Sequence, residues 1–89
     1  MKEVEIEIIN KLGLHARAAS KLVSISSRYA SRIELGKGGR FIDAKSIMAL
    51  LLSSASQGTL VVLRADGDDE DAALEAICTL INNRFDEPD

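Results

Sequence analysis

The apolar residues of this chain change their spacing several times, and the resulting order of short segments limits the folds open to it. At the start, Val4, Ile6 and Ile8 alternate with glutamates, which is the pattern of a strand with one face in water. From Ala16 to about Ala30, apolar residues recur every three or four positions, which predicts an amphipathic helix. The switch from one period to the other predicts helices packed against a sheet.

The rest of the chain continues this alternation. The further strand-like segments are residues 32–35, 40–43 and 59–65, and the further helix-like segments are residues 47–52 and a final stretch with inner positions Leu74, Ile77, Ile81 and Phe85. The order is therefore βαββαβα. Because a glycine-rich hairpin turn joins the second and third strands, we expect an α+β fold with helices on one face of a largely antiparallel sheet.

Length and composition restrict both the size of the protein and the class of its partners. The 89 residues, 46% of them hydrophobic, suffice for one domain (residues 1–89) with a single two-layer core. The net charge of −3 and the presence of only three aromatic residues argue against nucleic acid as a partner. No apolar run approaches the ~20 residues that cross a bilayer, and the charged start is not a signal peptide. We therefore expect a cytoplasmic protein that does not bind membranes.

For two features near the C-terminus we expect a structural role and no functional one. Cys78 has no partner for an internal disulfide and lies beside the inner stripe of the final helix, so we interpret it as a small buried hydrophobe. The acidic end, residues 86–89, is expected to fray.

The single histidine, His15, lies where a strand-like segment gives way to a helix. A helix N-terminus presents free backbone N–H groups, and with Arg17 beside it this position is suited to bind a phosphate. The same electropositive end favours a neutral, nucleophilic imidazole. These residues predict that His15 carries a phosphoryl group, which the Arg17 guanidinium and the amides of Ala16 and Arg17 would bind. A helix N-cap or a surface histidine without a role explains the residues equally well.

Motifs for self-contained catalysis are absent from the sequence. It contains no P-loop, no CxxC pair, no HExxH and no GxSxG. We therefore expect no cofactor, no metal and no enzymatic activity of its own, so that a donor protein would have to supply the other half of the phosphoryl-transfer chemistry.

The run Gly13-Leu14-His15-Ala16-Arg17-Ala18-Ala19 resembles the phosphorylation-site motif of the HPr family, the phosphocarriers of the bacterial phosphotransferase system. The resemblance extends over essentially the whole chain. It implies a four-stranded antiparallel sheet with three helices on one face, an open-faced two-layer sandwich. It also implies that His15 accepts a phosphoryl group, on Nδ1, from Enzyme I and passes it to EIIA-type proteins. We expect the protein to be a monomer. Where this chain has Ala18, the family usually has a proline. That proline would stiffen the first helical turn.

Ser46 stands directly before the apolar helix of residues 47–52, where serine is a preferred N-cap. The resemblance to the family adds that Ser46 is a target of HPr kinase/phosphorylase in organisms that have that enzyme. A phosphate there would place about two negative charges beside a docking surface and hinder an acidic partner. The candidate docking residues are Leu14, Ile47, Met48 and Leu51, of which we expect Ile47 and Met48 to be partly exposed, whereas Leu51 can equally face the core.

Alternative functions remain open at this point. Within the family, residues 53–58 and 84–87 look like the nitrogen-related NPr branch, whereas residues 46–48 look like kinase-regulated HPr of sugar transport. Outside it, a small regulatory domain of βαββαβ type would bind amino acids between subunits, and His15 would then be incidental. An RNA-recognition module of similar layout is disfavoured by the acidic charge and the lack of strand aromatics.

Overall fold

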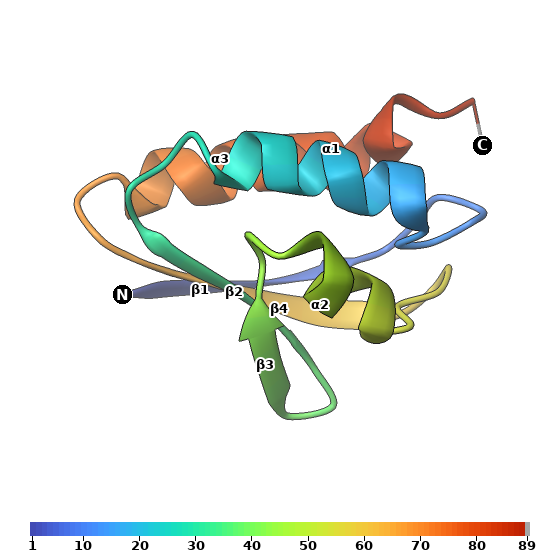
Figure 1. The fold of residues 1–89 in the computed structure, drawn as a ribbon, viewed down its shortest axis with the longest axis horizontal. Helices are drawn as coiled ribbons and strands as arrows, with labels where there is room; N and C mark the ends of the chain where they lie inside the picture. Colours follow the sequence, from blue (N-terminus) through green and yellow to red (C-terminus); the bar gives the residue numbers. More distant parts are fainter. Residues whose placement is uncertain (89) are drawn as a thin grey trace.

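The computed structural model describes residues 1–88 and confirms the predicted α+β architecture. Its elements in chain order are β1 (Lys2–Glu7), α1 (Ala16–Ser26), β2 (Arg32–Lys37), β3 (Arg40–Asp43), α2 (Ile47–Leu52), β4 (Leu60–Asp66), α3 (Glu70–Asn82) and the short 3₁₀ helix η1 (Arg84–Asp86). The strands form one antiparallel sheet in the order β1-β4-β2-β3. The three α-helices cover one face of this sheet, as Figure 1 shows.

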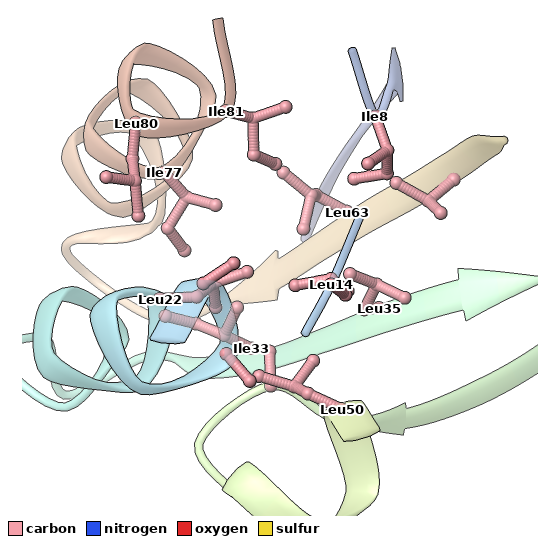
Figure 2. Packing of buried hydrophobic residues seen from close by; sticks show 14 of the residues in the cluster. Ile8, Leu14, Leu22, Ile33, Leu35, Leu50, Leu63, Ile77, Leu80 and Ile81 are labelled. Atoms are coloured by element: carbon pink, nitrogen blue, oxygen red, sulfur yellow. The ribbon is translucent and has the colours of Figure 1, made fainter. Parts of the chain in front are cut away.

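The core lies between the sheet and the helices. Alternate residues of the two central strands point into it: Ile33 and Leu35 of β2, with Val61, Leu63 and Ala65 of β4, are at most 1% exposed. The helices contribute Leu22, Leu50, Ile77, Leu80 and Ile81 to the same cluster; Figure 2 shows Leu22 and Leu50 near Ile33, and Ile81 near Leu63. Two-residue periodicity on the strands and helical periodicity on the helices thus bury a single shared cluster.

Two helices end earlier than the sequence predicts. The expected helix to about Ala30 stops at Ser26, and the following turn is held by Lys45, whose Nζ donates to the carbonyl of Tyr29 at 2.7 Å. The final helix stops at Asn82, so the prediction that Phe85 continues its stripe is wrong. Phe85 is nevertheless fully buried, because a left-handed turn at η1 folds it back onto the core.

Cys78 is half-buried beside the α3 stripe, and burial raises the pKa of its thiol. A thiol with a raised pKa is a poor nucleophile, in agreement with the structural interpretation. None of the helices within residues 1–88 is long and apolar enough to cross a membrane.

Candidate functional site

His15 is the N-cap of α1, as the sequence predicts for its position. Its backbone is extended, and its Nδ1 accepts a hydrogen bond from the backbone N–H of Arg17 at 3.3 Å. A neutral imidazole that accepts at Nδ1 carries its proton on Nε2. The cap role and the phosphoryl-acceptor role are therefore compatible, because the cap leaves the lone pair of Nδ1 facing the amides at the helix N-terminus.

Gly13 sets the approach of the chain to His15. It has a φ of 66°, and a Cβ added to it would lie 2.5 Å from the carbonyl oxygen of Ala55. This close contact lets the N–H of Leu14 donate to the same carbonyl at 2.8 Å. Glycine is needed here both for the left-handed backbone and for the space.

The other face of the imidazole contacts the C-terminal segment. His15 Nε2 is hydrogen-bonded to a carboxylate oxygen of Glu87, although the two residues are 72 positions apart in the chain. The second carboxylate oxygen of Glu87 accepts a bond of 3.1 Å from Nδ2 of the buried Asn10, which also donates to the carbonyl of Gly13 at 2.8 Å. Burial raises the pKa of the Glu87 carboxyl, but the bonds from His15 and Asn10 outweigh it, and the net shift is downward.

The expectation of a frayed acidic end is therefore wrong at Glu87, whose side chain is only 13% exposed. Phe85 anchors the segment in the core, and Lys21 Nζ donates to the carbonyl of Phe85 at 2.8 Å. Asp89 lies outside the described residues. Sequence reasoning missed Glu87 and Asn10 because both act through long-range contacts. The sequence signal for these contacts was Phe85, an apolar residue close to the C-terminus that could pack into the core and hold residues 84–88 against the protein.

A shallow cavity of about 680 Å³ lies over the imidazole. Its lining consists of Lys11, Leu12, His15, Ala16, Arg17, Glu87 and Pro88. Ala16 and Arg17 are exposed on the first turn of α1, and no carboxylate among the described residues pairs with the Arg17 guanidinium. The structure thus brings together the three residues expected to bind a phosphoryl group. Across residues 1–88, no cluster of three or more His, Cys, Asp or Glu side chains is arranged to hold a metal ion.

Ser46 is the N-cap of α2, and its hydroxyl accepts a bond from the N–H of Ala49 at 3.2 Å. The expected exposure of the neighbouring residues is confirmed: Ile47 is 42% and Met48 65% exposed, while Leu51 is half-buried. The expectation that Leu14 lies on the same surface is wrong, since its side chain is 5% exposed. The bond from Leu14 N–H to Ala55 draws the side chain into the core, next to Leu35 in Figure 2. Leu12 and Leu52 are exposed apolar residues that the sequence reasoning did not single out.

Comparison with known proteins matches the chain to one family. The family model described as "PTS HPr component phosphorylation site" covers residues 2–83. The Phosphocarrier protein HPr of Pseudomonas aeruginosa is 50% identical over 98% of both chains. The Phosphocarrier protein NPr of Shewanella violacea is 42% identical over 96% of this chain and 93% of that protein.

Solved structures agree with these sequence matches. HPr-C-His from Thermoanaerobacter tengcongensis superposes with a TM-score of 0.94 at 47% identity, covering 98% of both chains. An HPr dimer from the same organism gives a TM-score of 0.78 at the same identity, over 98% of this chain and 100% of that one.

Proposed function

The chain belongs to the HPr family of phosphocarriers, and on this basis we propose that His15 accepts a phosphoryl group from Enzyme I and donates it to EIIA-type proteins. A phosphocarrier of the phosphotransferase system is not a catalyst in its own right. The observation that supports His15 as the acceptor is the orientation of Nδ1, whose lone pair faces the N-terminus of α1 and accepts from the backbone N–H of Arg17.

The step is a displacement at phosphorus. Nδ1 attacks the phosphoryl group, the bond between phosphorus and the donor breaks, and a P–N bond forms. The Arg17 N–H that contacts Nδ1 then turns to a phosphoryl oxygen, together with the N–H of Ala16. The Arg17 guanidinium neutralises part of the added charge and orients the group. Because Arg17 and Ala16 are exposed, these contacts remain weak enough for an acceptor to remove the group.

Incubation with Enzyme I and labelled phosphoenolpyruvate tests this proposal. We expect one acid-labile, base-stable label per chain, lost in His15→Ala. Arg17→Ala should still be labelled, at a rate lower by on the order of tenfold, since one charge-assisted contact is lost. Label that persists in a folded His15→Ala variant would contradict the assignment.

We also propose that Ser46 is phosphorylated by an HPr kinase/phosphorylase and that the modification weakens docking. The hydroxyl is half-buried at the start of α2, directly before the exposed Ile47 and Met48. Two variants distinguish the effect of negative charge from the loss of the N-cap. Ser46→Asn keeps a side-chain acceptor for the cap and is neutral, whereas Ser46→Asp keeps the acceptor and adds a negative charge. Slower labelling by Enzyme I is expected for Ser46→Asp only; equal rates would exclude the regulatory role.

The docking surface that we propose comprises Ile47, Met48 and Leu51, whereas Leu14 supports it from the core. Met48→Glu should raise the KM of Enzyme I for this protein with little change in stability, since Met48 is exposed. Leu60→Glu is the matched control, because Leu60 is also exposed and is the first residue of β4. An equal effect of both changes on the KM would argue against a localised surface.

Residues 1–89 are proposed to act as one cytoplasmic domain and as a monomer, although a similar protein has been solved as a dimer. Both HPr and NPr occur among the relatives, so transfer assays with one EIIA protein from each branch would identify the acceptor. The amino-acid-binding alternative is not favoured, because the HPr family model accounts for residues 2–83.

A further inference from the structure

We propose that Glu87 is a positioning residue for phosphoryl transfer: its carboxylate, held by Asn10, keeps the His15 proton on Nε2 and thereby leaves the lone pair on Nδ1. The inference rests on the proposed role of His15 as acceptor and adds a partner for the opposite side of its ring. A carboxylate in this position accepts a hydrogen bond from one imidazole nitrogen and makes the other nitrogen more basic.

Contacts on both sides of the imidazole select the same tautomer. Nδ1 accepts from the Arg17 N–H, and Nε2 contacts a carboxylate, which can only accept when ionised. The Glu87 carboxyl is ionised at neutral pH, and its pKa is lowered further because the bonds from His15 and Asn10 outweigh the effect of burial. If the proton were on Nδ1, that N–H would face the N–H of Arg17. The lone pair of Nε2 would then face the Glu87 carboxylate, and both contacts would be repulsive.

The orientation of the buried Asn10 amide supports this arrangement. Nδ2 donates to both Glu87 and the Gly13 carbonyl, while Oδ1 has no partner among the described residues. Reversing the amide would place Oδ1 against two acceptors. Asn10 therefore serves as a donor to two acceptors, one of which is the carboxylate that contacts His15.

The segment that carries Glu87 has a defined path. Arg84, Phe85 and Asp86 all have positive φ values, of 56°, 54° and 62°, and this left-handed turn places Phe85 in the core. Lys21, on the second turn of α1, donates to the Phe85 carbonyl. The tail is thus tied to the same helix whose N-terminus carries His15, so the Glu87 carboxylate reaches the imidazole from a fixed support.

The chemical step uses this contact in both directions. As Nδ1 attacks phosphorus, the P–N bond forms, the donor bond breaks, and the ring gains positive charge while Nε2 keeps its proton. The Glu87 carboxylate stabilises that charge. In the reverse step the protonated ring is the better leaving group, because the electron pair of the P–N bond returns to a cationic imidazole.

Glu87→Gln tests the proposal, with Asp86→Asn as matched control. Each change removes one negative charge from the same turn, but the Asp86 side chain is 63% exposed and does not contact His15. The first readout is the ¹⁵N NMR signature of the two ring nitrogens at neutral pH, which identifies the protonated one without any phosphoryl transfer. The second is the single-turnover rate of labelling by phosphorylated Enzyme I.

We expect the wild type and Asp86→Asn to show the Nε2–H form and Glu87→Gln to show a mixture of tautomers. Labelling of Glu87→Gln should be slower by on the order of tenfold, as when the partner of a functional histidine is removed. Unchanged tautomers and unchanged labelling in Glu87→Gln would overturn the role of Glu87 and leave His15 as acceptor. A wild type that shows the Nε2–H form but takes no label would instead overturn the proposed function.

Discussion

At the scale of single residues, Gly13 determines whether the chain can bring His15 to the tip of α1. Its positive φ costs a side-chain-bearing residue about 1–2 kcal/mol, and a Cβ would also collide with the backbone of Ala55 and Ser56. Gly38 has nearly the same φ, 61°, but a Cβ added there would meet no atom within 4 Å. Substitution of Gly38 therefore measures the cost of backbone strain alone, without the collision that occurs at Gly13.

We therefore predict that Gly13→Ala lowers the free energy of unfolding by at least about 2 kcal/mol, whereas Gly38→Ala lowers it by about 1 kcal/mol. Denaturant unfolding of the two variants measures the difference. Equal losses would mean that the contact with Ala55 does not constrain the chain.

Asp69 illustrates a second residue-level effect, on the pH dependence of stability. The hydroxyl of Ser31 and then the backbone N–H groups of Ala30 and Ser31 donate to this carboxylate and lower its pKa below the ordinary 3.8. A carboxyl whose pKa is lower in the folded state stabilises the protein above its unfolded-state pKa, and that contribution disappears as the pH falls through the folded-state value.

Accordingly, the difference in unfolding free energy between the wild type and Asp69→Asn should be constant at neutral pH and shrink below about pH 4. Urea titrations at a series of pH values provide the measurement. Asp68→Asn, at the exposed neighbouring carboxylate, should show no such change. A difference independent of pH down to about 2 would contradict the role given to the ionised carboxylate.

At the scale of elements, lysines satisfy carbonyl groups where helical segments end. Lys45 donates to Tyr29 after α1, Lys37 donates to Ser53 and Ser54 after α2, and Lys21 donates to Phe85 in η1. Carbonyls in the turns that follow a helix have no partner within that helix, and a cation near its C-terminus also complements the helix dipole.

We predict that Lys45→Met lowers stability by about 1 kcal/mol, because the aliphatic part of the side chain is retained and the charged donor is lost. The matched change Lys11→Met removes an exposed lysine and should be neutral within about 0.5 kcal/mol. Thermal unfolding of both variants measures the two changes in stability. If the two variants lose the same stability, the contact between Lys45 and Tyr29 is not a functional cap.

The elements also show what local sequence can predict. Helix starts were predictable, since His15 and Ser46 lie at the caps where the change of period placed them. The end of α1 and the course of the C-terminal segment were not predictable, because they depend on contacts between residues far apart in the chain. These contacts are Lys45 with Tyr29 and Glu87 with His15. The candidate site divides in the same way. His15, Ala16 and Arg17 are adjacent in the chain and could be proposed from the sequence, whereas Asn10 and Glu87 come together only in the folded protein.

At the scale of the whole molecule, the C-terminal segment couples the core to the site. Phe85 is fully buried, and two residues later Glu87 contacts His15. A domain of this size has a stability of about 5–15 kcal/mol, so the loss of one large core residue is a substantial fraction of the total.

We predict that Phe85→Ala lowers the free energy of unfolding by about 3–4 kcal/mol and also releases Glu87 from the imidazole. Phe41→Ala is the comparison, since Phe41 is half-buried over the Arg64 guanidinium on the open face of the sheet and should cost less. Calorimetry reports the first effect and ¹⁵N NMR of the His15 ring the second. A Phe85→Ala protein that keeps the wild-type ring signature would show that the tail does not depend on this anchor.

The central claim is that the phosphoryl group is carried on the nitrogen that faces α1. Phosphorylation of ¹⁵N-histidine-labelled protein, followed by measurement of the coupling between ³¹P and each ring nitrogen, tests this claim directly. The coupling is expected at Nδ1 of His15, because Nε2 is occupied by its contact with Glu87. A phosphoryl group bonded to Nε2, or no phosphorylation of His15 at all, would contradict the account.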